Sequence, residues 1–480
     1  MESRQSRNGS RLKLFLENML VYGMGGVIGK MIPFLMVPIV TRLLPDTSYF
    51  GVNDIFTLIA SLGQTAVIMG MYDAMFRIFF DVDGEEKKKE VCSTALRMVV
   101  GNIVVIILIF LFFSKYLTQI FYHDEKYRGL LWLSLISIIC GGLNGIISAP
   151  TRMENRRIVF LCSNIVSSIV SYILAIILLM KGHYLTALPI GTTVSGMLIF
   201  VFQLFLNRKW FSCKYFNKKY LHEMLVIALP LVPNMLFYWL FNSCDRMMIT
   251  SYLGLEAAGI YAAGAKIGQI SQLIYMAFAG GWSYFAFSTM KDDDQVEMTS
   301  KIFEYLGIVT FITGMVMILA CKLIFSIMFP EEYQDGYIVS PYLFVSPLLL
   351  MLFQTAGNQF MVIKKTWINL LVLGVSALTN IGINWWLIRY IGIEGAAVGT
   401  YIGYIVSVLG VVVLLQKMKL LKVSGKFAVA VTIFMGYGII WRFYGINHSI
   451  LMVFLFFAAI FAYAFLYWKD VKVLVEQIKK

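Results

Sequence analysis

Charged side chains inside apolar stretches are the residues of this sequence best suited to chemistry. Lys30 lies midway along the first apolar run, the Asp245–Arg246 doublet lies in the outer third of the seventh, and Lys266 lies in the eighth. A charge at the centre of a bilayer costs at least about 2.5–3.5 kcal/mol, so such groups face protein or a water-filled cavity. Cations in a cavity would bind an anionic group. The alternative for Lys30 is a structural pair with an acid such as Asp54.

Polar residues recur at three- and four-residue steps on three of the apolar runs, which places them on one face of each helix. We predict that these faces meet at an interface and line a binding site, although hydrogen bonding between helices alone would also explain the amides. Arg42, at the outer end of the first run, is assigned either to the same cavity or to the headgroup region. The polar positions are Asp54, Thr57, Ser61 and Gln64 on the second run, Asn234, Tyr238, Asn242 and Asp245 on the seventh, and Gln269 and Gln272 on the eighth.

The elements that carry these residues are predicted to be transmembrane helices. The chain has 480 residues, of which 59% are hydrophobic and 14% charged, and its mean hydropathy is +0.77. Apolar runs of 18 or more residues, long enough to cross a bilayer, recur from end to end. We therefore predict an all-α polytopic membrane protein with about fourteen spans: 18–41, 50–71, 92–113, 130–150, 158–180, 186–206, 224–249, 259–285, 302–324, 338–363, 368–388, 396–415, 427–441 and 450–468.

The basic residues predict the orientation of these helices. With the N-terminus inside the cell, 28 of the 40 lysines and arginines fall in inner segments, 7 in outer segments and 5 within spans. Cytoplasmic loops of membrane proteins carry such an excess of positive charge. Both termini, residues 1–17 and 469–480, are therefore predicted to be cytoplasmic. The formal charge of +13 is explained by topology, and nucleic acid is not an expected partner.

An internal repeat divides the chain in two. A constant offset of 208 residues pairs Gly51 with Gly259 and Gln64 with Gln272, and it extends from the second span to the twelfth. Six spans per half give both halves the same orientation, so a pseudo-twofold axis along the membrane normal is expected, with a substrate site between the halves. Paired prolines, Pro33/Pro38 and Pro230/Pro233, should bend the first helix of each half. The predicted parts are an N-terminal lobe 18–206, a linker 207–223, a C-terminal lobe 224–415 and two additional helices within 427–468.

Residue patterns typical of enzymes are not found. The six cysteines lie singly, without the spacing of a disulfide framework or a metal site, and the four histidines lie in or beside predicted loops. No nucleotide-binding loop, nucleophile elbow or metal-protease motif occurs. We predict no catalytic residues, no metal and no cofactor.

Three segments resemble the polysaccharide-biosynthesis (Wzx-type) flippases of the multidrug/oligosaccharidyl-lipid/polysaccharide exporter superfamily. They are TRLLPDTSYFG at Thr41–Gly51, DRMMITSYLGLEAAGIYAAGAKI at Asp245–Ile267 and GIEGAAVGTYIGY at Gly392–Tyr404. The resemblance implies a V-shaped transporter of two lobes that works by alternating access in the bacterial inner membrane. Its substrate would be an oligosaccharide repeat unit on undecaprenyl pyrophosphate, moved to the outer leaflet for surface polysaccharide export.

The resemblance also suggests roles and partners. Lys30, Arg246 and Lys266 would bind the pyrophosphate, and amides and tyrosines would bind sugar hydroxyls. Membrane lipid and the polysaccharide polymerase machinery are expected partners, and the coupling ion is left open between a proton and sodium. The alternatives are a flippase for lipid II or a teichoic-acid precursor, and a cation-coupled multidrug exporter. A glycan polymerase is disfavoured, because the longest outer loop covers only about Ser114–Gly129.

Overall fold

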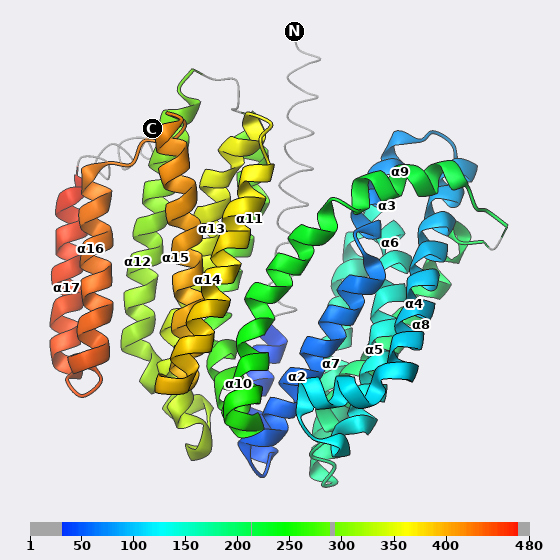
Figure 1. Ribbon diagram of the computed structural model, residues 1–480, viewed down its shortest axis with the longest axis horizontal. Coiled ribbons are helices and arrows are strands. Elements are labelled where there is room, and N and C mark those ends of the chain that lie inside the picture. Colours follow the sequence, from blue (N-terminus) through cyan, green and yellow to red (C-terminus); the bar gives the residue numbers. More distant parts are fainter. Residues whose placement is uncertain (1–30, 213, 289–292, 469–480) are drawn as a thin grey trace. The chain divides into compact units, whose positions relative to one another are not determined.

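The protein is helical throughout the part that a computed structural model describes, which is residues 31–212, 214–288 and 293–468, without the side chains of 242, 277, 280, 281 and 283–288 (Figure 1). Contacts divide the chain into two compact units, the first ending at Ala262 and the second beginning at Ala263. The helices of the first unit are Met31–Leu43, α2 Thr47–Ile68, α3 Met71–Asp81, α4 Glu85–Tyr122, α5 Arg128–Ile147, α6 Ala149–Met153, α7 Arg157–Met180, α8 Ala187–Asn207, α9 Lys218–Ala228 and most of α10 Leu231–Gly268.

The second unit holds the remaining helices and the end of α10. Its helices are α11 Ser271–Ser288, α12 Gln295–Met328, α13 Ser340–Val362, α14 Trp367–Ile391, α15 Ile393–Lys417, α16 Gly425–Ile440 and α17 Ser449–Leu466. The shortest predicted span, 427–441, corresponds to α16, which a π-helical turn at Trp441–Gly445 extends.

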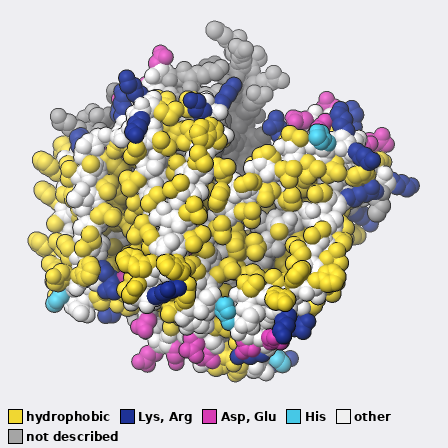
Figure 2. Space-filling model, in the orientation of Figure 1, with side chains coloured by type: hydrophobic (Ala, Val, Ile, Leu, Met, Phe, Trp, Pro, Cys, Tyr) yellow, Lys and Arg dark blue, Asp and Glu magenta, His cyan; other side chains and the backbone are white. Residues whose placement is uncertain are grey.

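Eleven helices of the described ranges are long and apolar enough to cross a membrane, and a bent pair makes up to twelve. Large apolar side chains are exposed along them, among them Phe112, Phe461 and Phe465 at 76%, 76% and 77%. Figure 2 shows such side chains along the helices of each unit and charged ones near their ends. The chain is a multi-pass membrane protein. The predicted spans 18–41 and 259–285 are only partly described, so the count of fourteen remains a prediction.

A proline and a glycine interrupt the helix within and just after the seventh predicted span. α9 and the first part of α10, Leu231–Phe241, are bent by 46° relative to each other. Pro230 lies in this break, where its missing N–H cannot continue a helical hydrogen bond, which confirms the predicted bend. Gly254 interrupts α10 with φ 87° and ψ 179°, a conformation that favours glycine. The turn between the predicted spans 224–249 and 259–285 is therefore a break at one residue within α10.

The two repeats meet at a pair of glycines inside the first unit. A Cβ atom on Gly51 would lie 2.1 Å from the carbonyl oxygen of Leu255, and one on Gly259 would lie 1.9 Å from that of Thr47. The 208-residue offset relates Thr47 to Leu255 as it relates Gly51 to Gly259, so the contact is reciprocal. Thr47 Oγ1 also donates to the carbonyl oxygen of Glu256 at 3.2 Å. The contact is locally symmetric, and the pseudo-twofold axis along the membrane normal remains a prediction.

Candidate functional site

Helix α2 carries the candidate site on its polar face. Asp46 caps its first turn by accepting from Ser48 N at 2.8 Å, and αL backbone at Met69 and Gly70 ends it. Ile55 and Val67 are buried on its apolar side, where α2 packs against α5 and α4. The polar residues Asp54, Thr57, Ser61 and Gln64 lie together on another face, as the spacing predicts.

A buried ion pair connects this face to α10. Arg246 Nε lies 3.3 Å from Asp54 Oδ2, and the two side chains are 18% and 6% exposed. Neither of these two atoms completes a hydrogen bond within the described structure, so the contact is electrostatic and loosely oriented. The sequence suggests Lys30 as a partner of Asp54. The structure pairs Asp54 with Arg246 instead. Lys30 lies outside the described residues.

The neighbouring carboxylate, Asp245, has separate partners. It accepts hydrogen bonds from the backbone N–H of Arg246 at 2.8 Å and from the hydroxyl of Tyr261. Asp245 is 4% exposed and Tyr261 1%. One arginine therefore lies among two buried carboxylates and a tyrosine. Tyr261 is absent from the predicted site, although it lies in the segment Asp245–Ile267 that carries the family resemblance.

The contact between α2 and α10 continues one heptad away. Trp239 Nε1 donates to Ser61 Oγ at 3.3 Å, seven residues after Asp54 on α2 and seven before Arg246 on α10. Helical residues seven apart share a face, so the two contacts define an antiparallel packing of α2 against α10. Trp239 and Arg246 lie beside the predicted polar face of α10, so the meeting of the two predicted faces remains a prediction.

Beside this contact lies a polar pocket of about 270 Å³ between α2, α5 and α8. The polar residues of α2 that follow Asp54 line this pocket, together with hydroxyl groups from α5 and α8. No charged side chain is among the described residues that line it. The lining residues are Phe56, Thr57, Ala60, Ser61, Gln64, Ser137, Cys140, Gly141, Thr192, Thr193 and Gly196.

The other predicted site residues are distributed over both units. In the first unit Arg42 is exposed and donates to the carbonyl oxygen of Pro38 at 3.4 Å, and Asn234 on α10 is half-buried. The side chain of Asn242 lies outside the described structure. In the second unit three residues are half-buried around the end of α10: Lys266, Gln269 and Gln272.

The second unit has a charged cluster that the sequence did not reveal. Arg442 binds Glu394 at the start of α15 through two parallel hydrogen bonds, of which Nη2 to Oε2 is 2.8 Å. Tyr342 donates to the same carboxylate at 3.2 Å. At the other end of α16, Glu304 accepts from the N–H and hydroxyl of Ser424 and from Tyr467. Both carboxylates join α16 and α17 to the rest of this unit.

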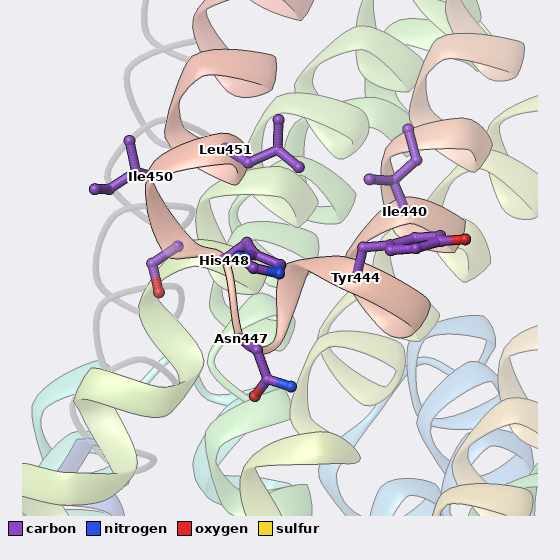
Figure 3. Close-up of a pocket in the computed structure, with 7 residues that line it drawn as sticks. Ile440, Tyr444, Asn447, His448, Ile450 and Leu451 are labelled. Atoms are coloured by element: carbon purple, nitrogen blue, oxygen red, sulfur yellow. The ribbon is translucent and has the colours of Figure 1, made fainter.

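A larger depression lies at the turn between α16 and α17. Its volume is about 730 Å³, and Figure 3 shows its lining residues Ile440, Tyr444, Asn447, His448, Ile450 and Leu451. Tyr444 and Ile450 are 68% and 89% exposed, so this is an open surface feature. In the described part of the chain, no three His, Cys, Asp or Glu side chains are grouped as a metal site requires.

Comparison with known families decides the classification. A family model described as polysaccharide biosynthesis protein matches residues 39–337. The chain belongs to the polysaccharide biosynthesis protein family. The match includes the ion pair of Asp54 and Arg246 and the pocket beside it, and it ends before Glu394 and Arg442. No curated protein sequence matches the chain significantly.

Solved structures show which fold this family member has. The lipid II flippase MurJ, in an inward closed conformation, is 16% identical and aligns over 95% of this chain and 100% of its own, with a TM-score of 0.71. An inward-facing multidrug resistance MATE transporter of the MOP superfamily is 15% identical over 82% and 94%, with a TM-score of 0.65. A MOP superfamily transporter from Pyrococcus furiosus is 15% identical over 85% and 95%, with a TM-score of 0.55. The chain has the fold of these transporters.

Proposed function

We propose that the chain is a flippase that moves an oligosaccharide repeat unit on undecaprenyl pyrophosphate from the inner to the outer leaflet of the bacterial plasma membrane. The family match and the transporter fold support this proposal. The observation that carries it is the face of α2, which runs from the buried Asp54–Arg246 pair to an uncharged pocket lined with hydroxyl groups. Charged and hydroxyl-binding groups on one helix face suit a substrate with a charged linker and a neutral glycan.

Under this proposal, the cations differ in how they could bind the pyrophosphate. Arg246 lies beside Asp54 and next to Asp245, so its charge is largely offset. Lys30 and Lys266 are the further candidates for the pyrophosphate, which a compact ammonium group binds as a point charge. Alternating access between the two repeats would carry the substrate across, with both termini in the cytoplasm. Polymerase machinery and a coupling proton or sodium ion are the partners that this mechanism would use.

The buried acids favour a flippase over a drug exporter. An exporter of cationic drugs needs a carboxylate that can accept a cation, and each deeply buried acid of the described structure already has partners. Asp54 has Arg246, Asp245 has Tyr261, Glu394 has Arg442 and Glu304 has Ser424. A flippase for lipid II or a teichoic-acid precursor needs the same chemistry, because these lipids also join a phosphate group to sugars, and it remains the second candidate.

Reconstituted protein can test the proposal. Proteoliposomes with the full chain and undecaprenyl-pyrophosphate-linked N-acetylglucosamine should expose the sugar to a membrane-impermeant lectin, while liposomes with lipid II or ethidium should show no transport. Lys30→Gln and Lys266→Gln should slow the exposure. Lys322→Gln, which removes an exposed lysine of α12, should leave it unchanged. Transport of lipid II alone, or of ethidium alone, would replace the proposed substrate with one of the alternatives.

A further inference from the structure

We propose that the pocket between α2, α5 and α8 is a subsite for one uncharged sugar ring of the transported glycan. This inference rests on the proposed function and names the part of the substrate that the first unit recognises. At about 270 Å³ the pocket is slightly smaller than the roughly 300–1,000 Å³ of pockets for drug-sized ligands, which suits a single ring. The absence of a charged group among its described lining residues selects a neutral ligand, because a charged one would lose its hydration without compensation.

A buried hydroxyl in this pocket lacks a partner. Thr193 is 2% exposed, lines the pocket, and its Oγ1 has no hydrogen-bond partner within the described structure. Buried polar groups are nearly always hydrogen-bonded, so an exception needs an explanation. The hydroxyl is closed to solvent in this conformation, so a ligand in the pocket supplies one when the Thr193 side chain turns toward it.

The other hydroxyl groups define what that ligand must offer. Thr57 donates to Asp54 O at 2.8 Å, Ser61 to Leu58 O at 2.9 Å, and Thr192 to Leu188 O at 3.1 Å. Their protons are committed to their own helices, so their oxygen lone pairs remain as acceptors, apart from the one on Ser61 that accepts from Trp239 Nε1. A ligand rich in O–H donors fits this pattern, and a sugar ring is such a ligand.

The space for a ring comes from small residues that only one repeat possesses. A Cβ atom on Gly196 would meet nothing within 4 Å, so this glycine leaves open space, whereas Gly141 makes room for Gln64, whose Nε2 would lie 2.3 Å from such an atom. The 208-residue offset places Leu349 and Tyr404 at the positions of these glycines, and Val345 at that of Ser137. These three side chains are buried in the second unit. The pocket is thus a feature of the first repeat that the symmetry of the fold does not require.

Two substitutions separate the chemistry of the pocket from its volume. Thr193→Val keeps the shape and removes the unpartnered hydroxyl. Gly196→Leu fills the space without a clash, because nothing faces that position. Thr379→Val and Gly101→Leu are the matched controls, since Thr379 is a half-buried threonine whose hydroxyl donates to its own helix and Gly101 also faces open space.

The experiment compares lipids that differ only in the sugar. Full-length protein in nanodiscs is titrated with bare undecaprenyl pyrophosphate and with the same lipid carrying glucose, N-acetylglucosamine or glucuronic acid. The native chain should bind at least one neutral-sugar lipid more tightly than the bare lipid, and the glucuronic acid lipid no more tightly. Thr193→Val should reduce the increase in affinity that the neutral sugar provides by about three- to tenfold, which is the effect of one lost hydrogen bond. Gly196→Leu should abolish this increase in affinity. Neither variant should change the affinity for the bare lipid.

Other results would overturn the inference in distinguishable ways. If the native chain binds neither kind of lipid, the proposed function fails and the subsite fails with it. If it binds the bare and neutral-sugar lipids equally, or if both variants keep the full gain, only the subsite fails. A saturable sodium affinity that is lost in Thr193→Val, with the sugar gain intact, would make the pocket a cation site.

Discussion

Each unit pairs an arginine with a buried carboxylate, but the geometry of the two pairs differs. In the first, Arg246 approaches Asp54 through a single 3.3 Å contact whose two atoms complete no hydrogen bond. In the second, Arg442 makes two parallel hydrogen bonds to Glu394, and Tyr342 adds a third donor. The first arginine is also the more buried, with 18% of its side chain exposed against 37% for the second.

This difference separates a loosely oriented ion pair from one with a fixed geometry. Bidentate arginine–carboxylate pairs have a defined geometry and hold two elements together. A buried pair with one unoriented contact repays less of its desolvation cost, so it is weak evidence for stabilisation. The Glu394–Arg442 pair therefore has the properties of a structural connection. The Asp54–Arg246 pair, beside a polar pocket, has those of a group that can exchange partners.

The largest effect is expected from breaking the fixed pair. Glu394→Ala leaves Arg442 and Tyr342 without their acceptor and should lower the free energy of unfolding by about 2–4 kcal/mol, near the lower end for a broken buried pair because Arg442 is partly exposed. Thermal unfolding of the purified protein measures this loss. The double variant with Arg442→Ala should recover part of it. A single variant as stable as the native chain would remove the structural role of this pair.

A smaller loss of stability is expected from the loosely oriented pair. Asp54→Asn should cost about 2 kcal/mol, less than the full cost of a broken buried pair, because the contact has no oriented hydrogen bond and Asp245 stays next to Arg246. Transport in proteoliposomes should nevertheless decrease, since the charge of Arg246 would be less well balanced. If Asp54→Asn destabilises the protein as much as Glu394→Ala does, the distinction between the two units is wrong.

The smallest effects should come from the tyrosines that support each cluster. Tyr261→Phe removes the donor to Asp245 in a fully buried position and should cost about 1–2 kcal/mol. Tyr342→Phe removes a 3.2 Å bond to a carboxylate that keeps both bonds to Arg442, so about 0.5 kcal/mol is expected. Parallel thermal unfolding of the two variants tests the order. A reversed order would mean that the first cluster is the more rigid one.

Much of the fold follows from sequence because its causes are local. Apolar runs of sufficient length predict the spans, the steps between polar residues predict the face of α2 that they occupy, and Pro230 predicts a bend. The repeat also aligns Gly51 with Gly259 as equivalent positions, although their contact is seen only in the structure. Each of these features depends on residues close in the chain or on a constant offset.

The partners of the charged residues could not be predicted in the same way. Periodicity places Asp54 on a helix face but does not say which neighbouring helix that face meets, and Arg246 is a long side chain with several carboxylates in reach. Tyr261 and Arg442 gave no signal, because a tyrosine in a glycine-rich segment and an arginine at a helix end are ordinary at membrane interfaces. The pocket depends on the space that Gly196 leaves open and on how Gln64 packs against Gly141, and both are properties of tertiary packing.

The partners of Glu304 and Glu394 also impose an order on biosynthesis. Both acids lie on helices made before α16 and α17, yet Ser424, Arg442 and Tyr467, which bind them, are the later residues. Ribosomes synthesise the chain from its N-terminus, so α12 and α15 enter the membrane with two carboxylates that still lack these partners. The second unit thus reaches its final packing only when the last helical hairpin arrives, and a ribosome that stalls before it would leave two acids for quality control to recognise.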